Sequence, residues 1–207
     1  MLISESHAVK RNIKRSSHKI AVAFSLLLAI ACSLAQSTPK PGINRDALIG
    51  TDFDKRVADY MKLHQQALTG LKVPQTTDSA QITVFQHQFA AKIRALRPSA
   101  RQGEIFTSEV ADWFHRLIAQ VMAGPDGAKI RASFEHAEPI RGIHLDVNQS
   151  YPDGLPLQSM PPSLLLNLPR LPKGVEYRFV GRELVLRDIP ANLIVDAIPD
   201  VTASKTQ

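Results

Sequence analysis

Cysteine is nearly absent from this chain of 207 residues, which contains only Cys32. A single cysteine cannot form an internal disulfide, so the fold must depend on a hydrophobic core rather than on cross-links. The length is sufficient, because the roughly 170 residues after position 35 are enough for one core or for two small lobes.

The motifs of nucleotide binding and nucleophilic catalysis are missing as well. Neither G-x-G-x-x-G nor the P-loop spacing occurs, so there is no glycine-rich loop to hold a phosphate. There is no G-x-S-x-G turn to present a serine, and no thiol remains if residues 1–35 are removed. These absences favour a non-enzymatic protein, and we assign no catalytic and no cofactor-binding residue.

Long hydrophobic runs are also scarce, and the longest lies within the first 35 residues. Five basic residues, from Lys10 to Lys19, precede an uncharged stretch of 16 residues at positions 20–35, which ends in Ser33-Leu34-Ala35. A basic region, an apolar region and a small-x-small site in this order are typical of an export signal. As a helix this stretch spans about 24 Å, short of the roughly 30 Å hydrocarbon core, so residues 1–35 are expected to be a cleaved signal peptide.

Two other fates of this segment stay open. An uncleaved anchor would leave the rest of the chain on the far side of the membrane. Lipidation of Cys32 is the third possibility, although Ala29 stands where a lipobox usually has leucine. In each case we expect an exported protein, periplasmic or extracellular, that contacts a membrane only through this segment or through Cys32.

The positive charge belongs largely to the export segment. The whole chain has 25 basic and 19 acidic residues, a net charge of +6. Residues 1–35 hold five of the basic residues and one acidic residue, which leaves 20 and 18 and a net charge of +2. This balance gives no basis for nucleic-acid binding.

The next part of the chain predicts a tether followed by helices. Residues 36–50 contain proline and glycine and predict a flexible tether. Residues 51–137 predict a helical lobe of about four helices, the first with Thr51 as its N-cap and Gly70 at its end. The expected starts of the other three are Asp78 or Ser79, Thr107 and Asp126.

Residues 138–207 predict a proline-rich connector and a three-stranded antiparallel β-meander. A strand is possible over residues 140–147, and residues 152–172 hold six of the 14 prolines and predict an extended connector. A type II′ turn at Gly181-Arg182 would place Tyr177 opposite Leu186, Phe179 opposite Leu184 and Glu176 opposite Arg187. The third strand is expected over residues 193–198, and a disordered tail after Pro199. The expected fold class is therefore α+β, with the N-terminal helices packed on the apolar face of the meander.

Five histidines follow the export segment: His64, His87, His115, His136 and His144. No two have the i, i+4 spacing of helical zinc ligands, so we assign no metal ligand and expect a solvated surface for His87 and His115. His64 lies on the apolar stripe of the first helix, so we expect it to be buried and neutral with one hydrogen bond. A protonation switch is the alternative role for this imidazole.

Two further clusters have structural explanations. Glu104, Glu109 and Asp112 could form a carboxylate pair, but acids near a helix start also favour the helix dipole and a solvated face. The aromatic side chains could line a ligand pocket, but their helical spacing predicts core positions. They are Phe85, Phe89, Phe106, Trp113 and Phe114.

Several segments, in their order along the chain, carry a family resemblance. They are FDKRVADY (53–60), RQGEIFTSE (101–109), YPDGLPL (151–157), LLLNLP (164–169), EYRFVGRELVLRD (176–188) and NLIVD (192–196). Together they resemble an uncharacterised family of exported bacterial proteins, seen chiefly in acidobacteria, over residues 52–198. The resemblance implies export and a shared fold, and it implies no activity because the family has none assigned.

The sequence therefore predicts an exported, non-enzymatic binding or accessory protein of the cell envelope. It does not identify the partner, for which another envelope protein is one candidate. An exposed edge of the meander or the proline-rich connector could bind that partner. The alternative is a small-ligand or metal-responsive module, or a hydrolase of unfamiliar type.

Overall fold

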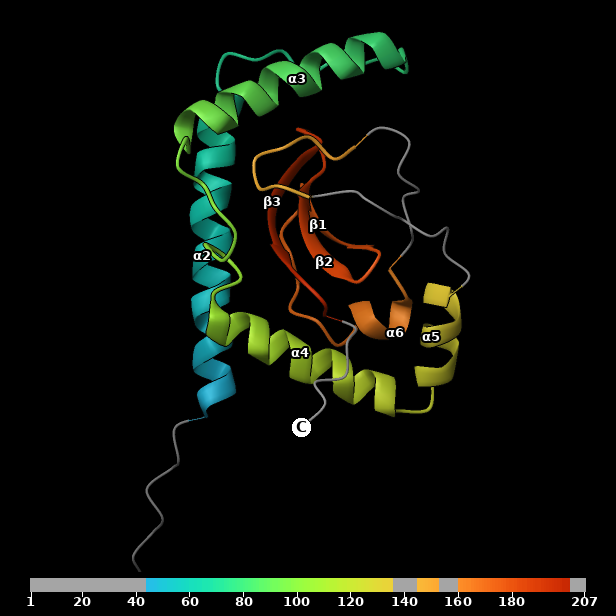
Figure 1. The fold of residues 1–207 in the computed structure, drawn as a ribbon. Coiled ribbons are helices and arrows are strands. Elements are labelled where there is room, and N and C mark those ends of the chain that lie inside the picture. Colours follow the sequence, from blue (N-terminus) through green and yellow to red (C-terminus); the bar gives the residue numbers. More distant parts are fainter. Residues whose placement is uncertain (1–43, 136–144, 153–159, 202–207) are drawn as a thin grey trace, which may run out of the picture. The chain divides into compact units, whose positions relative to one another are not determined.

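Five helices and a three-stranded sheet make up the described part of the chain, which covers residues 44–135, 145–152 and 160–201 of a computed structural model (Figure 1). The helices are α2 (Arg45–Leu68), α3 (Ser79–Leu96), α4 (Ser108–Ala123), α5 (Gly127–Glu135) and α6 (Pro162–Leu165). The strands are β1 (Val175–Val180), β2 (Glu183–Asp188) and β3 (Leu193–Ile198). The expected α+β class, with N-terminal helices and a C-terminal β-meander, is confirmed.

The register of the first hairpin is the predicted one. The pairs are Tyr177 with Leu186, Phe179 with Leu184 and Glu176 with Arg187. Gly181 has φ +59°, and Arg182 is not among the residues with positive φ, a combination that a type II′ turn requires. The third strand is also confirmed, and a bulge between Leu186 and Arg187 adjusts its pairing with β2.

Most helix starts follow the sequence signals. Asp78 caps α3 by accepting a hydrogen bond from the Ala80 N–H, and Thr107 caps α4 through the Val110 N–H. The expected start of the first helix at Thr51 is wrong, because α2 begins at Arg45 and is capped by the Asn44 side chain. Residues 45–50 therefore belong to the helix and not to the tether, whose residues 36–43 lie outside the described residues.

The packing around Gly50 accounts for a helix at a position where glycine favours a break. A β-carbon at this glycine would lie 3.2 Å from the Trp113 ring, so the missing side chain lets α4 pack closely against α2. This tertiary contact opposes the weak helix propensity of glycine, which is about 1 kcal/mol poorer than that of alanine.

The connector differs from the expected extended chain. Residues 162–165 form α6, with proline at the first helical position where no N–H is needed. Leu164 is fully buried in the core. Residues 140–144 of the possible strand and residues 153–159 of the connector lie outside the described residues. The described residues 145–147 form no strand.

The tail is ordered further than predicted. Val201 is buried, and its N–H donates to the Arg182 carbonyl at 2.9 Å, so the expected disorder directly after Pro199 is wrong for this residue. Residues 202–207 lie outside the described part of the chain.

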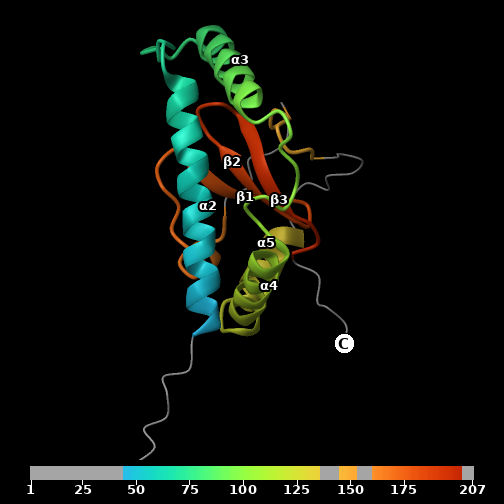
Figure 2. The same ribbon diagram turned by 90° about the vertical axis from the view of Figure 1, so that its left-hand side faces the viewer.

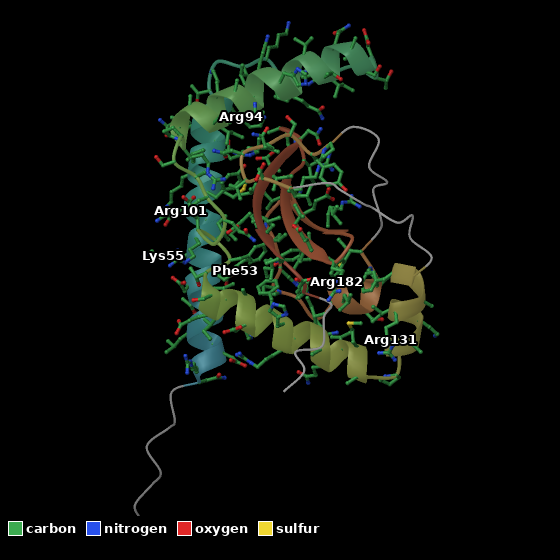
Figure 3. All side chains as sticks on the ribbon, in the orientation of Figure 1. Phe53, Lys55, Arg94, Arg101, Arg131 and Arg182 are labelled. Carbon is green, nitrogen blue, oxygen red and sulfur yellow. The ribbon has the colours of Figure 1, made fainter. Side chains whose placement is uncertain are left out.

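The helices cover one side of the sheet, which we call the helix side and define by Tyr177, Phe179, Leu184 and Leu186. Figure 1 and Figure 2 show α2 along this side. Helices α3 and α4 lie near opposite ends of α2. Figure 3 shows Phe53 on the sheet side of α2 and Lys55 on its outer side. Of the aromatic residues predicted for the core, Phe85, Phe89, Phe106 and Phe114 are buried, and Trp113 is half-buried against the same core.

The opposite side of the sheet, which we call the outer side, is also covered. It carries a second apolar cluster of Leu145, Tyr151, Val180, Val185, Ile194 and Ala197. The two residues from outside the meander, Leu145 and Tyr151, belong to a segment that hydrogen-bonds beside β3. The meander is thus a middle layer rather than a sheet with one solvated face.

Candidate functional site

A buried carboxylate joins α2 to the end of β2. Asp188 lies on the helix side together with Leu184 and Leu186, because every second residue of a strand faces the same side of the sheet. Its Oδ2 atom accepts a hydrogen bond from the Tyr60 hydroxyl at 2.7 Å and lies 2.6 Å from His64 Nδ1. Its Oδ1 atom accepts from the Ala191 N–H at 2.9 Å. Asp188 is fully buried and His64 is 4% exposed.

The hydrogen bonds of this cluster determine which of its groups donate and which accept. An ionised Asp188 can only accept, so Nδ1 of His64 must carry the proton of their hydrogen bond. Burial raises the pKa of Tyr60 far above its ordinary value, and the neighbouring Asp188 carboxylate raises it further, so Tyr60 is a neutral donor. The Arg97 guanidinium lies 5.4 Å from the centre of the Tyr60 ring.

The remaining ring nitrogen of His64 faces the chain just before β1. No described residue hydrogen-bonds Nε2, and a β-carbon at Gly174 would lie 3.9 Å from it. The Phe89 ring packs edge-on at 4.9 Å between ring centres. The prediction that His64 is buried with one hydrogen-bond partner is confirmed, and its role as a protonation switch stays a prediction.

A second buried carboxylate, Asp196, holds the loop between α3 and α4 against β3. Its Oδ1 atom accepts from the N–H groups of Gly103 at 2.9 Å and Ala197 at 2.8 Å. Its Oδ2 atom accepts from Ile105 at 2.7 Å and Phe106 at 2.8 Å. Burial raises the pKa of Asp196, and the four N–H donors oppose that rise. The carboxylate therefore serves an internal purpose and has no free oxygen for a ligand.

The edge of β3 that does not pair with β2 is occupied by groups from the same chain. Arg97 donates to the Val195 carbonyl at 3.2 Å, and Gln102 donates to the Ala197 carbonyl at 3.0 Å. Ile194 exchanges backbone hydrogen bonds with residues 148–149. An added strand needs free backbone groups at the edge, so the β3 edge cannot receive a partner strand without losing these contacts.

The other histidines and acids singled out in the sequence are dispersed. His87 is exposed on α3 and His115 is half-buried on α4, while His136 and His144 lie outside the described residues. Within the described ranges no group of three or more His, Cys, Asp and Glu could hold a metal ion. Glu104 pairs with Arg97 at 2.9 Å and Glu109 with Arg45 at 3.2 Å, so these two acids bind different arginines.

An open groove lies between α2 and the chain before β1. It has a volume of about 810 Å³ and is shallow and open to solvent. Its floor is apolar, and its rim carries charged and amide side chains. The lining residues are Asp54, Val57, Ala58, Met61, Lys62, Gln65, Arg170, Leu171 and Pro172. This feature, which we call the α2 groove, offers ligands both apolar surface and charge.

Another open groove lies between residues 72–76 and the first half of α3. Its volume is about 620 Å³, and its lining includes Val73 and Val84, which are 53% and 57% exposed. Lys72 is the charged residue in its lining. This groove therefore offers apolar surface with little charge to select a ligand.

Sequence reasoning missed both buried carboxylates. Asp188 is the last residue of β2, and the two-residue period of the strand places it with Leu184 and Leu186. Asp196 is the one charged residue of the strand LIVDAI, and an acid in an otherwise apolar strand is a signal that it has an internal partner. Apart from the N–H groups of Ala191 and Ala197, their donors lie about 90 to 130 residues away, so no local pattern identifies them.

Comparisons of the chain with protein-family models, with curated proteins and with solved structures gave no match. None of the helices in the described ranges has the length and the apolar character needed to cross a membrane. The contacts described above and the sequence are therefore the basis for a functional proposal.

Proposed function

We propose that this chain is an exported, non-enzymatic binding protein of the cell envelope. The order of basic, apolar and small residues at positions 1–35 supports export. The family resemblance over residues 52–198 supports the same compartment. The ligand of such a protein would bind in the α2 groove.

The α2 groove is the observation that carries this proposal. It is an open groove with a volume of about 810 Å³ and a largely apolar lining. Apolar residues of α2 and of the chain before β1 supply contact area, and charged residues at the rim supply selectivity.

The buried polar groups support binding rather than catalysis. General acid–base chemistry needs a titratable group that a substrate can reach within about 3 Å. Asp188 and Asp196 are fully buried, and each of their oxygens already accepts a hydrogen bond from the protein. Their chemistry is used to hold the elements together.

Native mass spectrometry of the protein purified from the envelope fraction of its host tests the proposal. We expect a chain that begins at Gln36 and a second component bound without a covalent bond. Ala58→Trp should remove that component, because the indole would fill the exposed Ala58 position in the groove. Ala119→Trp, at an exposed site on α4, is the matched control and should keep it.

Two results would contradict the proposal. A chain found only in the cytoplasmic fraction would exclude export. A bound component that both tryptophan variants retain would place the binding site elsewhere, and a stoichiometric metal ion would favour a metal-responsive module.

A further inference from the structure

The shape of the α2 groove favours an elongated ligand. One wall is a stripe of α2 that runs from Asp54 through Ala58 to Gln65. Eleven residue steps of helix correspond to about 16 Å. An extended peptide advances about 3.3 Å per residue, so a stripe of this length matches about five residues of extended chain.

The depth of the groove favours a peptide over a small molecule. Small-molecule sites usually bury most of their ligand in a concave cavity. The α2 groove is shallow and open instead. Its opposite wall is the short segment of Arg170, Leu171 and Pro172, and a peptide laid between a helix and such a segment would contact both walls.

The charges at the rim favour a peptide that carries an acidic side chain. Arg170 is exposed and has no hydrogen bond or ion pair with any described residue. Lys62 adds a second positive charge, although it also contacts Asp59 at 2.7 Å on the surface. Asp54 is the one acid in the lining, so basic groups outnumber acidic ones.

Met61 gives the floor of the groove an adaptable surface. It is half-buried, and its methyl group would lie 3.8 Å from a β-carbon at Gly174. Methionine is unbranched and flexible, which suits a surface that must fit different apolar side chains.

We infer that the α2 groove binds an extended peptide segment of a partner protein, with an apolar side chain on Met61 and an acidic side chain paired with Arg170. This inference rests on the proposed binding function and names the class of partner. The experiment must therefore distinguish two failures: a ligand that is not an extended peptide, and a binding site outside the α2 groove.

The probe is a displayed library of random ten-residue peptides, selected against the protein purified from the envelope fraction. We expect enriched sequences to carry Asp or Glu within a few residues of a large apolar side chain. A fluorescein-labelled copy of the most enriched peptide then gives affinities by anisotropy. Affinity should fall as salt is added, because rim charges are screened.

Charge reversal at the rim is the decisive comparison. Arg170→Glu should weaken the labelled peptide about fivefold to tenfold, because an attractive pair becomes a repulsive one. Repeated selection on this variant should enrich basic peptides. Lys173→Glu is the matched control, since Lys173 is exposed three residues away and does not line the groove, and it should change affinity by less than about twofold.

Several outcomes would overturn the inference. They are enriched peptides without acidic residues, equal effects of the Arg170 and Lys173 variants, or no enrichment at all. If Ala58→Trp still removes the bound component from the envelope protein, the binding function stands and only the peptide class is wrong. If Ala58→Trp also leaves that component in place, both proposals fail.

Discussion

Charged side chains have different kinds of partner on the two sides of the sheet. On the helix side, Asp188 and Asp196 are fully buried and are surrounded largely by donors from α2 and from the loop before α4. On the outer side, the Glu176 carboxylate is 22% exposed and lies between Arg178 at 2.7 Å and Arg187 at 2.8 Å. One side uses hydrogen bonds across distant segments, and the other uses ion pairs within a hairpin.

This difference shows which contacts depend on the whole fold. The Glu176–Arg187 pair follows from the register of one hairpin, and Arg187 is held further by the Asn192 side chain at 2.6 Å. Asp188 and Asp196 each accept one hydrogen bond from a nearby backbone N–H, of Ala191 and Ala197. Their other donors arrive only when α2 and the loop before α4 pack on the sheet. A buried carboxylate without its donors is costly, so these two residues make the packing of helices on sheet specific.

The largest effect is expected from Asp196→Asn. The amide nitrogen would face two backbone N–H groups and leave them without an acceptor, which costs about 1–3 kcal/mol for each group. We expect the free energy of unfolding in urea to fall by about 3–5 kcal/mol. Asp200→Asn is the control, because Asp200 pairs with Arg182 at the exposed surface, and it should change stability by less than about 0.5 kcal/mol.

Removing one of the hydrogen-bond donors to Asp188 tests the buried charge on the same side of the sheet. Tyr60→Phe removes a donor from a buried carboxylate and should cost about 1.5–3 kcal/mol. Tyr177→Phe removes a hydrogen bond to the neutral Pro169 carbonyl and should cost only about 0.5–1.5 kcal/mol. Equal losses in urea unfolding would show that the charge of Asp188 contributes nothing to its hydrogen bonds.

His64 and Asp188 should also be energetically coupled. His64→Leu is expected to leave the protein folded but less stable. In a double-mutant cycle with Asp188→Asn, the two losses should fail to add by about 0.5–3 kcal/mol, as residues in contact usually do. Additive losses would mean that the 2.6 Å contact contributes no pairwise energy.

Gly174→Ala should have a smaller effect, at the point where the chain passes His64. Gly174 has φ +101°, which disfavours a side chain by about 1–2 kcal/mol. The nearest atom to the new methyl group is 3.7 Å away, so backbone strain rather than a clash is the expected cause. Gly181→Ala is the comparison, because Gly181 also has positive φ (+59°) and no atom lies within 4 Å of its added β-carbon, so a similar loss would identify backbone strain as the cause.

The smallest effect is expected on the outer side, from Glu176→Gln. Burial raises the pKa of Glu176, but hydrogen bonds from Arg178 and Arg187 outweigh this and hold the pKa below the ordinary 4.5. A lowered pKa stabilises the folded state at neutral pH, and that contribution is lost as the pH falls below about 4.5. The stability difference between wild type and Glu176→Gln should therefore shrink on acidification.

Glu109→Gln provides the comparison for this pH profile. Glu109 pairs with Arg45 at an exposed site, where ion pairs contribute little. We expect a flat difference from wild type between pH 7 and pH 3 in thermal unfolding. A constant difference for Glu176→Gln as well would contradict the role given to its two arginines.

The elements that the sequence predicted well are those with local causes. The first hairpin follows from Gly181, from the two-residue period of the strands and from one opposite-charge pair. The starts of α3 and α4 follow from Asp78 and Thr107, which cap backbone N–H groups two or three residues away. The start of α2 was predicted wrongly because Asn44 competes with Thr51 as a cap, and the Trp113 contact with Gly50 is not visible in the sequence.

The candidate site shows the same division. Period and composition placed His64 in the core, and they could have placed Asp188 and Asp196 there too. The α2 groove could not be predicted, because its walls are about 110 residues apart in the chain. A groove is a property of two surfaces that meet, and no spacing within either segment describes it.

By itself, the sequence determined the strands, the register of the first hairpin and the starts of α3 and α4, because these depend on residues within a few positions of each other. Only the tertiary structure decided which donors meet Asp188 and Asp196, and that both sides of the sheet are covered. The physical reason is that a buried charge needs partners from whatever packs against it. Those partners are selected by the fold as a whole.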